Sequence, residues 1–356
     1  MSFAPLDAPV LSINPTLKVL NMKKTLLQQF KKMGVLTAGL ICVWQAQAQL
    51  APTADQVVGA LEKLNGVTPG ERRNHILGIC VKGTFVGEKS VEAFSRSALF
   101  SGATIPVVGR FSLAGGNPKA PDSTKSPRGL ALQFALPGNN IHHFTMLNVP
   151  VFSAATPQTF YDALMSNMPD PATGKPDPEK QKAFRETHPD AKPLGEFMAK
   201  NNPPSSYANS DFFSIHTFKF LNQKNETTLV KWQFVPEEGV KRLTDAEMAS
   251  APARFLDDDL IAKTGKGPVR WKMLLTIGEP GDEQTNPTVY WPAERKKIQA
   301  GVLTLTSATP QKGADCEKIN FDPLVMSDGI APTADPVLNF RSPAYASSFG
   351  KRLSGQ

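Results

Sequence analysis

The feature that most restricts the fold of this chain is a series of short apolar or alternating segments separated by turn-forming residues. Gly, Pro, Asn and Asp punctuate the chain between them. The segments are residues 76–86, 104–113, 129–136, 143–152, 212–222, 227–236, 269–277 and 301–307. Many short strands joined by turns favour an antiparallel β-barrel.

Helical periodicity appears in other parts of the chain. The predicted helices are residues 51–65, 157–167, 178–200 and 244–263. Thr244-Asp-Ala-Glu247 has the pattern of a capping box, and Asp335 also marks a helix start. Residues 114–128 and 168–180 are rich in Pro, Gly, Asp and Lys, so we predict exposed loops there rather than domain linkers. The fold class is therefore α+β, an antiparallel barrel with peripheral helices.

The amino-terminal stretch from Met22 has the layout of a secretory signal. Four lysines precede an apolar run from Met33 to Trp44, and Ala46-Gln-Ala48 fits a small-x-small cleavage site. We predict a leader over residues 1–48, cleaved near Ala48/Gln49, and a single domain over 49–356. The apolar run is short for a membrane span, so an uncleaved anchor is the alternative. The expected location is the periplasm or outside the cell, with no stable membrane anchor after cleavage.

The charge and cysteine content narrow the classes of partner. The leader carries five lysines and one aspartate, so its removal lowers the net charge from +7 to +3. No basic block interleaved with aromatic residues remains, which argues against nucleic-acid binding. Cys42 leaves with the leader. In an exported protein Cys80 and Cys316 can pair, although two separate buried thiols are equally compatible with the sequence.

Near the carboxyl end, Arg341-Ser-Pro-Ala-Tyr345 places an arginine four residues before a tyrosine. In a helix this spacing is one turn, so the guanidinium lies over the phenol and can stabilise its anion. A phenolate is a ligand of haem iron. An ordinary surface helix would show the same spacing, so other segments must decide.

Several separated sequence motifs indicate a resemblance to a known family. They are Arg72-Arg-Asn-His75-Ile-Leu-Gly78, Gly83-Thr-Phe85, Gly109-Arg110-Phe-Ser112, Pro127-Arg128-Gly129, Asn148-Val-Pro-Val-Phe152, Phe213-Ser-Ile-His216-Thr-Phe218, Phe321-Asp-Pro, Asp328-Gly-Ile and Asp335-Pro-Val-Leu. In order and spacing they resemble the haem catalases over roughly residues 56 to 356. The chain ends soon after the tyrosine, where large catalases continue, so it looks like the small, exported catalase-related peroxidases. We therefore expect no NADPH binding, because the resemblance does not extend to the segment that builds that site in large catalases.

The resemblance implies roles for single residues at the haem. His75 would be the distal acid-base, with Ser112 on its other ring nitrogen, and Asn148 would orient the peroxide. Phe152 would form an apolar wall, with Phe160 a weaker candidate at the haem edge. On the other side Tyr345 would bind the iron, with Arg341 sharing its charge. The arginines expected at the haem propionates are Arg72, Arg110 and Arg352.

We therefore expect a haem b peroxidase that reduces hydrogen peroxide or organic hydroperoxides with a small organic electron donor. Asn74 stands where typical catalases have an apolar residue, so we expect weak catalase activity at most. A hydroperoxide isomerase of the allene oxide synthase kind and a non-catalytic exported haem-binding protein are the alternatives. His216 receives no role, and His142, His143 and His188 are predicted to face solvent. The oligomeric state stays open.

Overall fold

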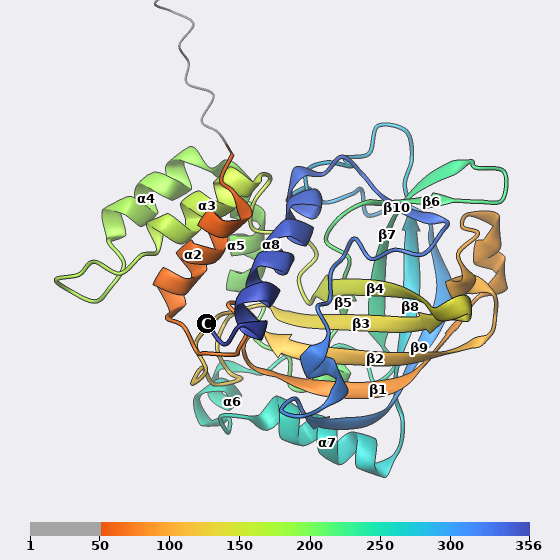
Figure 1. Ribbon diagram of the computed structural model, residues 1–356, viewed down its shortest axis with the longest axis horizontal. Helices are drawn as coiled ribbons and strands as arrows, with labels where there is room; N and C mark the ends of the chain where they lie inside the picture. The colour runs from red at the N-terminus through yellow and green to blue at the C-terminus, as the bar shows by residue number, and fades with distance from the viewer. Residues whose placement is uncertain (1–50) are drawn as a thin grey trace, which may run out of the picture. The chain divides into compact units, whose positions relative to one another are not determined.

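The computed structural model describes residues 51–356, so the predicted leader lies outside the described part of the chain. An antiparallel β-barrel dominates this part (Figure 1). Eight strands form the ring in the order β7-β5-β4-β3-β2-β1-β9-β8, and β8 pairs back with β7. Two further strands, β6 and then β10, extend the sheet from β7. The predicted α+β class with an antiparallel barrel is confirmed.

The strands follow the predicted segments closely, apart from the short β10, which was not predicted. They are β1 (Gly78–Gly87), β2 (Thr104–Leu113), β3 (Arg128–Leu136), β4 (Asn140–Leu147), β5 (Phe212–Phe213), β6 (Phe218–Leu221), β7 (Thr227–Pro236), β8 (Val269–Ile277), β9 (Lys297–Pro310) and β10 (Ile330–Pro332). The predicted strand 212–222 is in fact two strands, because the chain turns between them at Ile215, whose φ is +57°. The predicted 143–152 strand begins and ends earlier.

Aromatic side chains fill the barrel. Phe85 packs edge-on against Phe134 with ring centroids 5.4 Å apart, and Phe111 stacks on Tyr207 at 4.6 Å. Trp271 is fully buried, and its indole N–H donates to the carbonyl of Ser210. Large rings supply both the apolar burial and the offset or edge-on contacts that aromatic pairs prefer. The barrel interior is thus a packed core, and a ligand site must lie outside it.

The helices lie around the barrel. They are α2 (Ala54–Asn65), α3 (Pro157–Ser166), α4 (Pro178–Thr187), α5 (Lys192–Lys200), α6 (Asp245–Ser250), α7 (Phe255–Lys266) and α8 (Pro336–Leu353). Figure 1 shows α2 to α5 grouped on one side of the barrel, with α8 running between this group and the strands. Helix α7 packs on β9. Two predicted helices are each broken in two, at Pro189 and at Pro252, because proline cannot continue a helix from the preceding turn.

Two histidines predicted to face solvent are buried. His142 and His143, on β4, are 1% and 4% exposed. Nδ1 of His142 accepts a hydrogen bond from the Ser327 amide, and Nε2 of His143 lies 2.9 Å from Oε1 of Gln133. The prediction was wrong because the later segment around Ser327 covers this strand, a contact that local sequence does not reveal.

The two remaining cysteines are paired. The Sγ atoms of Cys80, on β1, and Cys316, in the short 3-10 helix η6 (Asp315–Lys318), are bonded, and their Cα atoms lie 5.5 Å apart. Both residues sit in an apolar cluster with Phe321. This settles the alternative that the sequence left open.

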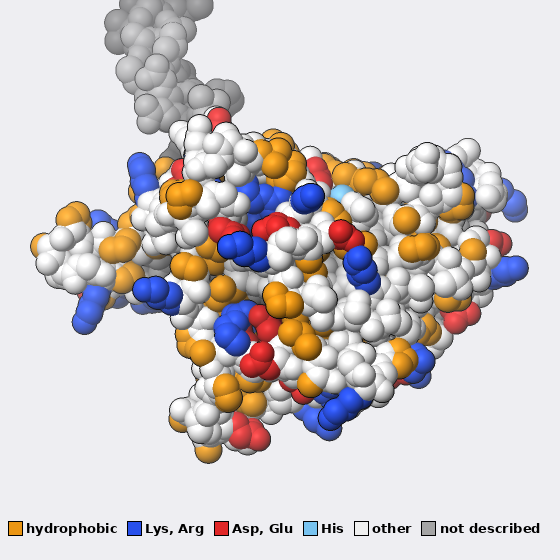
Figure 2. All heavy atoms as spheres, turned by 60° about the horizontal axis from the view of Figure 1, so that its bottom comes forward, with side chains coloured by type: hydrophobic (Ala, Val, Ile, Leu, Met, Phe, Trp, Pro, Cys, Tyr) orange, Lys and Arg blue, Asp and Glu red, His pale blue; other side chains and the backbone are white. Residues whose placement is uncertain are grey.

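The surface mixes charges of both signs. On the face shown in Figure 2, Lys and Arg side chains are interspersed with Asp and Glu. None of the helices in residues 51–356 has the length and apolar character that a membrane crossing needs.

Candidate active site

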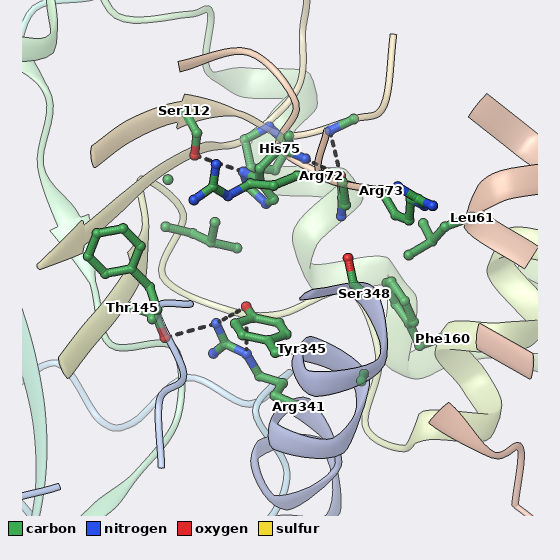
Figure 3. Close-up of a pocket in the computed structure, with 18 of the residues that line it drawn as sticks. Leu61, Arg72, Arg73, His75, Ser112, Thr145, Phe160, Arg341, Tyr345 and Ser348 are labelled. Atoms are coloured by element: carbon green, nitrogen blue, oxygen red, sulfur yellow. Dashed lines mark hydrogen bonds between the residues drawn. The ribbon is translucent and has the colours of Figure 1, made fainter. Parts of the chain in front are cut away.

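A cavity of about 500 Å³ lies beside the barrel and is lined by β2, β3, β4, α2, α3 and α8 together with the loop that precedes β1. Its size is typical of a ligand pocket. Figure 3 shows His75 and Tyr345 on opposite sides of the open space. Two side chains that are 270 positions apart in the sequence thus face one another.

The backbone of His75 is held in an uncommon conformation. Its φ is +55°, in the left-handed region that residues with a Cβ rarely adopt. Oδ1 of Asn74 accepts hydrogen bonds from the amides of His75, at 2.9 Å, and of Gly115, at 2.7 Å. These bonds compensate for the strained conformation and fix the loop. The polar residue that departs from the typical catalase string therefore has a clear local function.

A hydrogen bond to Ser112 positions the imidazole of His75. Its Nδ1 lies 2.9 Å from Oγ of Ser112, on β2, which leaves Nε2 available to a ligand in the cavity. Gly129, on β3, leaves the space for this pair, since a Cβ there would come within 2.6 Å of Oγ of Ser112 and 3.3 Å of Nδ1 of His75. Burial, followed by the positive charges of Arg110, Arg341 and Arg72, lowers the pKa of His75 to about 3. The imidazole is therefore neutral near pH 7 and is able to accept a proton.

Tyr345 lies on α8 one helical turn after Arg341, as the four-residue spacing predicts. Nη2 of Arg341 donates to the phenol oxygen at 2.7 Å, and Nε does so at 3.2 Å. The same Nη2 donates to Oγ1 of Thr145, on β4, at 2.9 Å. Two N–H donors of one guanidinium thus converge on the phenol oxygen (Figure 3).

Three arginines meet at one end of the cavity without a carboxylate partner among residues 51–356. Arg72, Arg110 and Arg352 all line the cavity, and none forms an ion pair there. Burial and repulsion from Arg110 and Arg352 lower the pKa of Arg72 to about 8, and burial lowers that of Arg110 to about 10. Because arginine keeps its proton in proteins, these directions indicate uncompensated positive charge.

Arg73 differs from its neighbour Arg72 in having a carboxylate partner. Its Nε pairs with Glu62, on α2, at 2.7 Å, and its other nitrogens donate to the carbonyls of Glu71 and Gln356. The neighbouring Arg72 has a buried Nη1 that finds no partner within residues 51–356. A cluster of this kind fits an apolar ligand that carries two carboxylates, because planar guanidinium groups pair with carboxylates through two hydrogen bonds.

Asn148 follows β4 directly, and its expected role in orienting a peroxide stays a prediction. Its side-chain Oδ1 accepts a hydrogen bond from the backbone amide of Arg128 at 2.7 Å. The backbone amide of Asn148 donates in turn to the Arg128 carbonyl. The neighbouring Leu147 contributes to the cavity lining. Asn148 therefore joins the end of β4 to the start of β3, a structural use that a matching string cannot reveal.

Apolar side chains form the remaining walls. Phe152 lines the cavity as predicted, and its ring lies 5.7 Å from that of Phe160, which also lines it. Sequence reasoning missed the contribution of α2. The apolar residues it supplies are Val57, Val58, Leu61 and Leu64. Their helical spacing was visible, but which face of α2 meets the cavity depends on its packing against α8.

A buried His–Asp pair anchors the start of the helix that carries Tyr345. Nδ1 of His216 lies 2.7 Å from Oδ2 of Asp335, and both side chains are at most 1% exposed. Oδ1 of Asp335 accepts hydrogen bonds from the amides of Val337 and Leu338 at the start of α8. The sequence marked Asp335 as a helix start but gave His216 no role.

Comparison with known proteins agrees with this arrangement. A profile of the Catalase family matches residues 55–356. The chain is 55% identical over 323 residues to a catalase-related peroxidase of Synechococcus elongatus, covering 91% of this chain and 93% of that protein. A catalase-related peroxidase of Mycolicibacterium paratuberculosis is 29% identical, with 83% and 93% covered. A catalase of Schizosaccharomyces pombe is 29% identical, and this chain matches 58% of its length.

Solved structures show the same fold. A fungal catalase superposes with a TM-score of 0.73 at 23% identity, covering 80% of this chain and 60% of that one. A bacterial catalase gives the same score and identity, with 86% and 64% covered. The family profile extends over nearly all of the described residues, and the cavity lies where the matching strings converge. The chain belongs to the catalase family.

Proposed function

We propose that this chain is a haem-dependent peroxidase that reduces hydrogen peroxide or organic hydroperoxides with a small organic electron donor. The observation that carries the proposal is a single cavity with a neutral histidine on one side, an arginine-paired tyrosine on the other and an unpaired arginine cluster at one end. The names of the two catalase-related peroxidases support the same reading.

The residues fit haem b as the cofactor. Tyr345 would bind the iron, with Arg341 sharing the phenolate charge, and the arginine cluster would neutralise the two propionates. The apolar wall around Phe152 and α2 suits the porphyrin face. When bound, the haem iron supplies the redox chemistry that peroxide reduction requires.

The protein's own part in the reaction is proton transfer. Nε2 of His75 would accept the proton of the peroxide hydroxyl and deliver it to the oxygen that leaves as water or alcohol. Ser112 keeps Nδ1 occupied, so the same ring nitrogen serves in both steps. Asn74, which lines the cavity beside His75, is polar where typical catalases have an apolar residue, so it alters the surroundings of the histidine. We therefore propose that catalase activity is weak.

We also propose that the mature domain, residues 49–356, works in the periplasm or outside the cell. The Cys80–Cys316 disulfide supports this location, because such bonds persist in oxidising compartments.

The test is donor oxidation by the haem-loaded protein with an organic hydroperoxide and a chromogenic donor. His75→Ala should lower the rate by about 10²- to 10⁴-fold, the usual contribution of general acid–base catalysis. His188→Ala is the matched control, because His188 stacks on Phe184 away from the cavity lining and its loss should leave the rate unchanged.

Other outcomes identify the rival functions. Rearrangement of a lipid hydroperoxide without any donor would indicate a hydroperoxide isomerase. Haem binding with neither reaction would indicate a haem carrier. A protein that binds no haem would contradict all three.

A further inference from the structure

The Cys80–Cys316 disulfide lies directly behind the arginine cluster. Cys316 belongs to the turn that follows β9, residues 311–319, which we call the arginine-holding segment. Nη2 of Arg72 donates to the backbone carbonyls of Cys316, Glu317 and Ile319, at 3.2, 3.3 and 3.1 Å. One disulfide-bonded residue thus contacts a cavity arginine through its own carbonyl.

The same segment also holds the second arginine. Oε1 of Gln311 accepts hydrogen bonds from Nε and Nη2 of Arg110, at 2.9 and 2.6 Å. Nε2 of Gln311 donates to the carbonyl of Ile76, next to His75 in the chain. Both arginines are therefore oriented by one short turn.

Apolar packing of Ala314 and Ile319 and one ion pair also join this turn to the barrel. Lys82 and Asp315 form an ion pair at 2.7 Å, but their side chains are 59% and 64% exposed, and exposed pairs of this kind contribute little. The disulfide is buried, with Cys80 4% and Cys316 0% exposed. It is a covalent connection between the segment and β1, the strand that pairs with the Arg110 strand.

The arrangement works against electrostatic repulsion. Arg72 and Arg110 are like charges near one another and without a carboxylate partner in residues 51–356, so they repel until an anion binds. The three carbonyls and Gln311 hold the guanidinium groups in place, and they do so only while the turn keeps its position. Holding donors in place before the ligand arrives reduces the ordering cost of binding.

We propose that the Cys80–Cys316 disulfide is a positioning element for the carboxylate-binding end of the cavity, acting through the arginine-holding segment on Arg72 and Arg110. The proposal rests on the proposed haem-binding function. It extends that function because the disulfide, besides stabilising the fold, would hold the two arginines that bind the cofactor's carboxylates.

The experiment measures the rate at which ferric haem leaves the loaded protein for an excess of an apo-globin acceptor. The double variant Cys80→Ala/Cys316→Ala removes the disulfide and leaves only apolar side chains in the cluster around it. This variant and Arg72→Ala should each lose haem about tenfold faster, the effect of weakening one charge-assisted hydrogen bond. Combining them should accelerate the loss by less than the product of the two effects, because both act on Arg72. Lys82→Ala, which removes only the exposed pair between the same segments, is the control.

A second readout separates positioning from general loosening. Haem dimethyl ester lacks the two carboxylates, so the wild type should lose it faster than haem. In Cys80→Ala/Cys316→Ala this ratio should shrink towards one. If the variant does not fold, phosphine reduction of the disulfide in the loaded wild type provides the same comparison.

The outcomes are distinct. If haem and its ester leave the variant faster by the same factor, the disulfide only stabilises the fold and the proposal is wrong. Equal haem loss from variant and wild type would also overturn it while leaving the peroxidase function intact. A wild type that binds no haem would refute the proposed function itself.

Discussion

At the scale of single residues, the position of the His75 imidazole depends on two nearby residues, Asn74 and Gly129. His75 holds a left-handed backbone conformation, which costs a residue with a Cβ about 1–3 kcal/mol. Asn74 compensates with one oxygen that accepts from two amides. Gly129 contributes by having no side chain, because a Cβ there would come within 2.6 Å of the Ser112 hydroxyl that holds the imidazole.

Gly129→Ala tests this packing. The added methyl group would displace Ser112 or the imidazole, so the reaction with peroxide should slow by about 10- to 100-fold, as misplacement of a catalytic group by about 1 Å does. Stopped-flow mixing of the haem-loaded protein with an organic hydroperoxide measures the rate. Gly59→Ala on α2 is the control, since a Cβ there has no heavy atom within 4 Å. Unchanged kinetics in Gly129→Ala would show that Gly129 has no part in positioning His75.

The sequence predicted the principal residues of the site but not the direction of every side chain. His75 and Tyr345 face the same cavity because their strings carry the backbone geometry with them, including the one-turn spacing to Arg341. Asn148 also lies in a matching string, and its side-chain oxygen accepts a hydrogen bond from the Arg128 amide that the string does not predict. Whether a residue beside a strand end faces a cavity or a neighbouring strand depends on pairing partners that are distant in the sequence.

At the scale of elements, α8 is the part on which the site depends most. Asp335 caps its first turn with one carboxylate oxygen and holds His216 with the other. Burial lowers the pKa of His216 to about 4, although the hydrogen bond to Asp335 opposes the shift. The start of α8, ten residues before Tyr345, is thereby fixed to the segment between β5 and β6, which carries His216.

Asp335→Ala should therefore destabilise the protein and loosen the haem. Loss of the cap costs about 1 kcal/mol, and a buried histidine without its partner adds about 1–3 kcal/mol. Urea unfolding of the loaded protein measures the sum. Thr244→Ala, which removes the cap of the exposed helix α6, should cost only about 1 kcal/mol and leave haem retention unchanged. Equal costs for the two variants would contradict the role of Asp335.

Element positions were predicted better than element ends. Alternating and apolar runs located the barrel strands because each strand has one face in the core. The breaks between α4 and α5 and between α6 and α7 were missed, although Pro189 and Pro252 mark them. The closing pair of the barrel, β7 with β8, could not be read from local pattern at all.

At the scale of the whole molecule, buried neutral histidines make stability depend on pH. Burial, with a smaller effect from His143, lowers the pKa of His142 to about 3. In the unfolded chain a histidine titrates near 6.5, so below that pH the unfolded state binds a proton that the folded state does not. Stability is fully present above pH 6.5 and is lost as the pH falls towards 3.

The expected loss is up to about 1.4 kcal/mol per pH unit for each such histidine. Urea unfolding at pH 7, 6 and 5 should show it, and His142→Asn should reduce the slope by one histidine's share. Asparagine supplies an oxygen that can accept from the Ser327 amide in place of Nδ1. An identical slope in wild type and variant would mean that His142 is not neutral in the folded state.

The central claim is that this cavity binds haem through the phenolate of Tyr345. The most direct measurement is the absorption spectrum of the ferric, haem-loaded protein beside Tyr345→Phe, with Tyr290→Phe, whose residue is 50% exposed, as the control. We predict a tyrosinate-ligated ferric spectrum in the wild type and in Tyr290→Phe that is lost in Tyr345→Phe. The same spectrum in all three proteins would contradict the claim.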